Sequence, residues 1–149
     1  MKLNSLILTL LALSPFANAT QWLEVENAYV RATPPHATTS AMFATIHNNS
    51  DRDRTLVSAT TDLAQVVELH DVIMDGDMMQ MRQISRISIP ASQSVALAPG
   101  SLHVMLLDLL GPLKEGQQVA ITLTFADNET VTLQVPVKKV MAGMKMKHH

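Results

Sequence analysis

The sequence of 149 residues contains no cysteine. Disulfide bonds and thiolate metal sites are therefore excluded. A blue-copper electron carrier is excluded as well, because its metal site needs a cysteine thiolate. Any metal site in this chain must be built from other donors.

Familiar catalytic motifs are also missing. The chain has neither the G-x-S-x-G turn of α/β-hydrolases nor the H-E-x-x-H helix of zinc proteases. Three acids, Asp71, Asp75 and Asp77, do not complete a calcium loop, and turn chemistry accounts for the last two. We therefore expect a binding protein and not an enzyme.

The chain also lacks a basic stretch outside its C-terminal end. Lys and Arg number 11 against 13 Asp and Glu, for a formal net charge of -2. Scattered positive charge of this kind predicts no nucleic-acid partner. Nothing in the sequence indicates an obligate dimer, so we expect a monomer.

Long apolar runs occur only at the N-terminus. Lys2 precedes an apolar stretch at residues 6–13, and Ala17-Asn18-Ala19 forms an A-x-A cleavage signal. The run is too short to span a bilayer, and no later one could insert. We predict a cleaved secretion signal at residues 1–19, a domain at 20–137, a tail at 138–149 and a periplasmic location.

Short segments with turn residues between them dominate the domain. Residues 119–125 alternate apolar and polar side chains, as a half-buried strand does. The other expected strands are 22–31, 41–47, 54–60, 66–74, 78–84, 87–89, 94–97, 103–110 and 130–137. For residues 61–65, a short helical turn is the alternative to a strand or loop. The pattern predicts an all-β Greek-key sandwich or barrel.

Four residues stand out for their chemistry. His70, Met81, His103 and Met105 form an H-x10-M-x21-H-x-M pattern in a chain with ten methionines. Thioether sulfur is a soft neutral donor and imidazole a borderline one. The set therefore suits Cu(I) or Ag(I) better than zinc, calcium or magnesium.

Strand geometry brings these residues together in pairs. His103 and Met105 are two apart on an expected strand, so they share one face. If Asp75-Gly76 forms a type I′ turn, His70 lies directly opposite Met81. A three-residue loop would instead place Arg82 opposite His70. Whether the two pairs approach each other is left open.

Ordinary packing is the alternative for each residue taken alone. A methionine in a strand usually fills a core, as we expect for Met42 and Met74. His36 and His47 are expected to be surface or hydrogen-bonded residues. The methionines at 78–81 could equally serve hairpin packing, which would leave a metal-free interaction module.

The pattern and its surroundings resemble the periplasmic copper chaperone family PCu(A)C. The similar segments are DGDMMQMR at 75–82, PGSLHVMLL at 99–107, PLKEG at 112–116 and the closing hairpin at 119–137. The resemblance implies a cupredoxin-like β-sandwich that binds Cu(I) through His70, Met81, His103 and Met105. It also implies copper delivery toward the binuclear copper site of cytochrome c oxidase, with the oxidase subunit or a Sco-type chaperone as acceptor.

The C-terminal tail offers a second set of donors. They are Met141, Met144, Met146, His148 and His149. Short His-rich tracts often bind metals, and some relatives carry similar extensions, so an auxiliary copper-collecting arm is one hypothesis. A solubilising end is the other. For the whole protein, a role in copper or silver tolerance or in buffering is an alternative to copper delivery.

Overall fold

The computed structural model describes residues 22–139, and their regular structure consists of ten β-strands. The strands are β1 (Leu23–Arg31), β2 (Thr39–Asn48), β3 (Arg54–Thr60), β4 (Ala64–Asp75), β5 (Met78–Ile84), β6 (Ile87–Ile89), β7 (Ser94–Leu97), β8 (His103–Leu109), β9 (Gln118–Phe125) and β10 (Thr130–Lys138). The predicted signal at 1–19 and the five tail donors lie outside the described residues. Within residues 22–139, no helix is long and apolar enough to cross a membrane.

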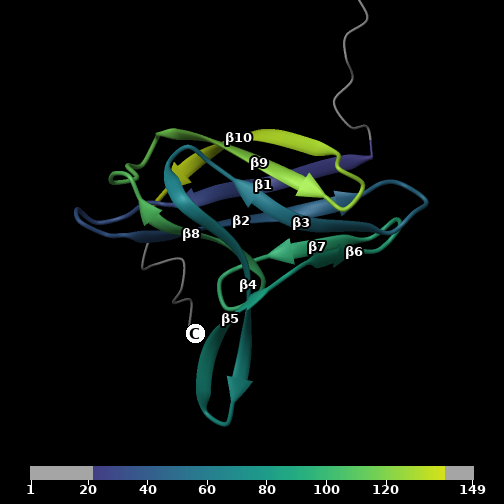
Figure 1. Ribbon diagram of the computed structural model, residues 1–149, viewed down its shortest axis with the longest axis horizontal. Coiled ribbons are helices and arrows are strands. Elements are labelled where there is room, and N and C mark those ends of the chain that lie inside the picture. The colour runs from purple at the N-terminus through teal and green to yellow at the C-terminus, as the bar shows by residue number, and fades with distance from the viewer. Residues whose placement is uncertain (1–21, 140–149) are drawn as a thin grey trace, which may run out of the picture.

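The strands form two layers of a β-sandwich (Figure 1). One layer has the order β5-β4-β8-β2-β1, with β7 also paired to β2, and the other has β10-β9-β3-β6. The layers are joined where β1 runs parallel to β10, with Val30 opposite Val137. The predicted all-β sandwich is thus confirmed, and each strand lies within a few residues of its expected place.

The core fills the space between the layers. Ile121 and Leu123 of β9 are fully buried, whereas Thr122 between them is half-buried, which is the predicted alternation. On β8, Val104 and Leu106 are also fully buried and face the core. His103 and Met105 therefore point to the opposite, outer face of their layer. The candidate site is a surface feature of one layer and not part of the core.

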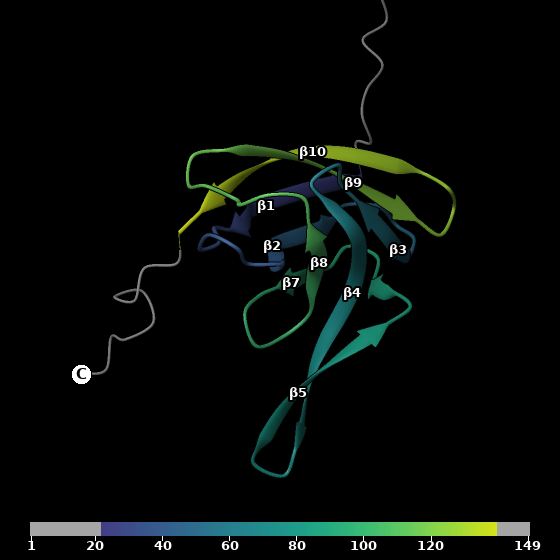
Figure 2. The same ribbon diagram turned by 60° about the vertical axis from the view of Figure 1, so that its left-hand side comes forward.

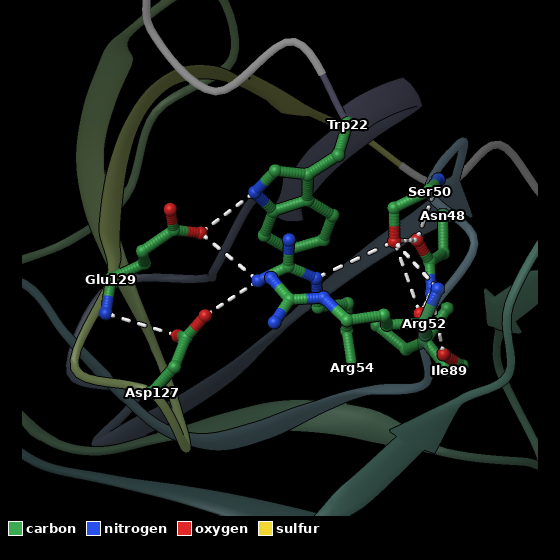
Figure 3. A network of polar contacts seen from close by, with 8 residues as sticks. All are labelled: Trp22, Asn48, Ser50, Arg52, Arg54, Ile89, Asp127 and Glu129. Atoms are coloured by element: carbon green, nitrogen blue, oxygen red, sulfur yellow. Dashed lines mark hydrogen bonds and ion pairs between the residues drawn. The ribbon is translucent and has the colours of Figure 1, made fainter.

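A polar network connects Trp22, just before β1, with Arg54 and the β9–β10 turn (Figure 3). The Arg54 guanidinium lies 4.2 Å from the centre of the Trp22 ring and pairs with Asp127 and Glu129 in the β9–β10 turn. The Trp22 indole N–H donates to Glu129 across 2.7 Å, and its ring packs edge-on against Phe125. These contacts hold the start of β1 to the opposite layer.

Two expectations about local structure and burial are wrong. The proposed helical turn at 61–65 is a two-residue turn followed by β4, which begins at Ala64. Met42 is fully buried as expected, but Met74 is 63% exposed. The reason is that β8 pairs with β4 no further than His70, so the rest of the β4–β5 hairpin extends beyond the sandwich (Figure 2).

Candidate metal centre

The pairing of β4 with β8 brings the two histidines together. In this antiparallel ladder, His70 lies directly opposite His103, and their ring centroids are 5.6 Å apart. Two residues further along, Glu68 lies opposite Met105. The approach of the two pairs, which the sequence left open, is therefore made by adjacent strands.

The hairpin register differs from the predicted one. Asp75 lies opposite Met78, so the turn residues are Gly76 and Asp77. Gly76 has a φ of 61°, and Asp77 is not among the residues with positive φ, which is the pattern of a type II′ turn. Glycine at the first central position favours this type over the type I′ turn that we expected.

The altered register moves Met81 without changing its face. His70 now faces Gln83, and Met81 faces Val72, so the predicted direct pairing of His70 with Met81 is wrong. Because the shift is two residues, Met81 stays on the same face as His70, as its diagonal neighbour at about 7–8 Å. A one-residue shift would have turned the sulfur away.

Three of the four residues line one cavity. Met81, His103 and Met105 surround a space of about 270 Å³, together with the ring of Phe43 and the loop at Gly100. His70 does not line it, but its ring centre lies 5.6 Å from that of His103. The structure thus brings the four predicted residues to the same outer face of the layer, three of them around the cavity and His70 beside His103.

Each histidine uses one ring nitrogen and leaves the other free. His103 Nδ1 lies 2.8 Å from the Ser101 carbonyl oxygen, which only accepts, so Nδ1 carries the proton. His70 Nε2 lies 2.6 Å from a carboxylate oxygen of Glu68. The remaining atoms, His70 Nδ1 and His103 Nε2, are buried without a hydrogen-bond partner among the described residues.

Such unpaired nitrogens point to a ligand. A buried polar atom without a partner costs about 1–3 kcal/mol. In metal sites, the second ring nitrogen usually donates to a carboxylate or a backbone carbonyl, which fixes the ring and raises its basicity. Glu68 supplies a carboxylate to His70, and Ser101 supplies a backbone carbonyl to His103. Each ring therefore has, on one nitrogen, the kind of hydrogen bond that a metal-binding histidine usually makes.

The surroundings favour a soft cation over a hard one. Phe43 is 4% exposed, and its ring centre lies 6.1 Å from that of His103. The Arg31 guanidinium, which also lines the cavity, lies 5.6 Å from the Phe43 ring. Between residues 22 and 139 there is no group of three His, Cys, Asp or Glu side chains that could hold a metal. Zinc and calcium sites need such groups.

Exposure is uneven among the four residues. His103 is 3% exposed and the His70 side chain 13%, whereas Met81 is 63% exposed. Both histidines lie on strands held by neighbours on each side, and Met81 lies on the edge strand β5. The site therefore has a rigid, buried part and one accessible thioether.

A family model described as "Putative lipoprotein LpqE-like" matches residues 23–137, which is nearly the whole described domain. The chain belongs to this LpqE-like family. It is 34% identical over 117 residues to "Putative lipoprotein Lxx21020" of Leifsonia xyli, an alignment that spans 78% of this chain and 69% of the relative.

Solved structures share the fold of this chain. The solution structure of CuI-DR1885 from Deinococcus radiodurans is 35% identical, with a TM-score of 0.68 and 85% of each chain covered. The copper-bound PCuAC domain from PmoF2 has a TM-score of 0.70 at 23% identity, covering 83% of this chain and 97% of that one. The resemblance to the PCu(A)C family and the cupredoxin-like fold are thereby confirmed.

Sequence reasoning missed the groups that support the histidines. Glu68 lies two residues before His70 on the same strand, so alternation alone could have placed it on the same face. Phe43 carries no such signal, because it lies on β2, far from both histidines in the sequence. Ser101 is only two residues before His103, but a backbone carbonyl has no residue-type signal that would predict its contact with the ring.

Proposed function

We propose that this protein is a periplasmic copper chaperone that binds Cu(I) through His70, Met81, His103 and Met105. The observation that carries the proposal is the pair of buried, unpaired imidazole nitrogens beside two thioethers. The finer role that we propose is delivery of copper toward the binuclear copper site of cytochrome c oxidase. The acceptor would be the oxidase subunit itself or a Sco-type chaperone.

Donor chemistry supports Cu(I) as the cargo. Two imidazoles and two thioethers are neutral, and thioethers select Cu(I) over hard divalent ions. One relative of similar sequence bears Cu(I) in its name, CuI-DR1885. Without a thiolate, this site should hold copper less tightly than a thiol-rich acceptor does, and this difference gives transfer its direction.

Exposure supports a route for release. Met81 is 63% exposed on a hairpin that projects from the sandwich, whereas the two histidines are held in the layer. An acceptor's donor atom can therefore replace the Met81 thioether first. Methionine needs no proton to leave, so the departure of the Met81 thioether does not itself depend on pH.

The binding claim is tested by titrating Cu(I) under anaerobic conditions against a chelator and by recording X-ray absorption of the complex. We expect both sulfur and nitrogen ligands. His103→Ala and Met105→Leu should each weaken binding, whereas Met78→Leu and His36→Gln, at exposed positions, should not. A metal shell without sulfur, or unchanged affinity in both site variants, would contradict the proposal.

The delivery claim needs a separate experiment. A deletion strain is tested for oxidase activity at limiting copper and for growth in excess copper. Loss of oxidase activity that copper supplementation restores supports delivery. Normal oxidase with poor growth in excess copper or silver would instead assign a tolerance or buffering role.

We also propose that the tail acts as an auxiliary metal-collecting arm. Its donors are Met141, Met144, Met146, His148 and His149. Removing residues 141–149 should lower the number of copper ions bound while leaving the affinity of the main site unchanged. An unchanged stoichiometry would refute this role.

A further inference from the structure

Four methionines of the β4–β5 hairpin are exposed to solvent. Met74, Met78, Met79 and Met81 are each between 61 and 65% exposed, and every residue of β5 except Ile84 is exposed. Core packing therefore does not explain them. Large apolar side chains gathered on a surface usually mark a binding site.

Strand pairing divides these methionines between the two faces of the hairpin. Met74 lies directly opposite Met79, and Met81 lies two residues beyond Met79 on the same strand. These three share one face, because side chains two apart in a strand point the same way. Met78 lies opposite Asp75 and points to the other face.

The shared face leads to the candidate metal centre. Met81 lines the cavity with His103 and Met105, and Gly100 forms part of its rim. A Cβ at position 100 would lie 3.8 Å from the Met79 methyl carbon, so Met79 reaches the same rim from the hairpin. Met74 lies directly opposite Met79, at the same distance from the hairpin tip.

We propose that Met74 and Met79 form a second, weaker position for a soft monovalent cation, Cu(I) or Ag(I), beside the main site. This inference rests on the proposed function, since it adds an entry and exit step to that site. Directly opposed side chains have Cβ atoms about 4.5–5.5 Å apart, so two flexible thioethers can reach one ion. Soft sulfur is the donor that these cations prefer.

In this arrangement, Met81 lies between the outer Met74–Met79 position and the main site. It follows Met79 along the face and lines the main cavity, so an ion held by the outer pair lies next to a ligand of the inner site. Asp75 and Asp77 at the exposed tip add negative charge that attracts a cation. An ion can thus move inward through successive thioethers without being released to water.

The test uses the full chain with methyl-labelled methionine, followed by NMR during titration with Ag(I) and, without oxygen, with Cu(I). Single Met→Leu variants assign the signals, and the titration continues until no methionine methyl moves. We expect Met81 and Met105 to shift with the first equivalent. Met74 and Met79 should then shift together at higher metal, while Met78 stays in place. In Met74→Leu, the later shift of Met79 should be lost, and in Met78→Leu it should be kept.

Each other outcome has a defined meaning. Stationary Met74 and Met79 signals, with Met81 and Met105 shifting, would overturn the second position and leave the main site intact. Shifts of Met74 and Met79 that are complete at the first equivalent would also overturn it, because the outer pair would only sense the main site. Stationary Met81 and Met105 would refute the proposed function instead.

Discussion

Glu68 provides the sharpest test of the proposed copper site. Its carboxylate lies 2.6 Å from His70 Nε2, and the two side chains are 24% and 13% exposed. The contact is therefore partly shielded from water. If His70 binds copper through Nδ1, Glu68 orients the ring and adds a negative charge on its far side.

The size of the effect has two parts. A carboxylate about 6 Å from a monovalent ion contributes about 0.7 kcal/mol in water-like surroundings and about 2.8 kcal/mol at an effective dielectric constant of 20. Losing a hydrogen-bonded group behind a metal ligand typically lowers metal affinity about 10–100-fold, or about 1.4–2.7 kcal/mol. We expect Glu68→Ala to fall in this range.

Two substitutions separate the contribution of the charge from that of the hydrogen bond. Glu68→Gln keeps an acceptor for His70 Nε2–H but removes the charge, so its loss of affinity should be smaller than that of Glu68→Ala. The assay is competition for Cu(I) with a chelator at fixed pH, and the control is Glu115→Ala, at an exposed position outside the site. Unchanged affinity in Glu68→Ala, in a protein where His70→Ala abolishes binding, would refute the proposed role.

Three further predictions concern stability. Arg54→Ala should lower the free energy of unfolding in urea by about 1.5–3 kcal/mol, because the carboxylates of Asp127 and Glu129 lose the buried guanidinium that pairs with both. An effect no larger than that of the exposed Arg52→Ala would contradict this. Leu106→Ala should cost about 2–5 kcal/mol, because Leu106 is fully buried, whereas Leu110→Ala, at 62% exposure, should change stability by less than about 0.5 kcal/mol. Gly76→Ala should strain a residue with a φ of 61° by about 1–2 kcal/mol, which predicts about 5–30-fold faster amide hydrogen exchange in the hairpin; unchanged exchange would show that the turn does not need glycine.

The strands were predictable because their causes are local. Alternating side chains in β9 and turn residues between segments depend on neighbours in sequence, and the structure follows them closely. Errors occurred where a distant partner decides the outcome. Met74 looked like a core residue because the sequence does not reveal that β8 stops pairing at His70.

The β4–β5 hairpin was predicted in the correct place but in the wrong register. The sequence predicts a turn around Gly76, but either Asp75-Gly76 or Gly76-Asp77 can form a two-residue turn there. The type II′ turn places glycine at the first central position and moves the register by two residues. Because a strand alternates with period two, the predicted face of Met81 was correct even though its predicted partner was wrong.

By itself, the sequence determined the donor chemistry of this protein: no thiolate, two imidazoles and two thioethers, with His103 and Met105 spaced to share one face of a strand. These features follow from residue type and strand period. Only the tertiary structure decided that His70 meets His103 and that Met81 stays exposed. Those facts depend on which strands become neighbours, and strand neighbours are chosen by the packing of the whole sandwich.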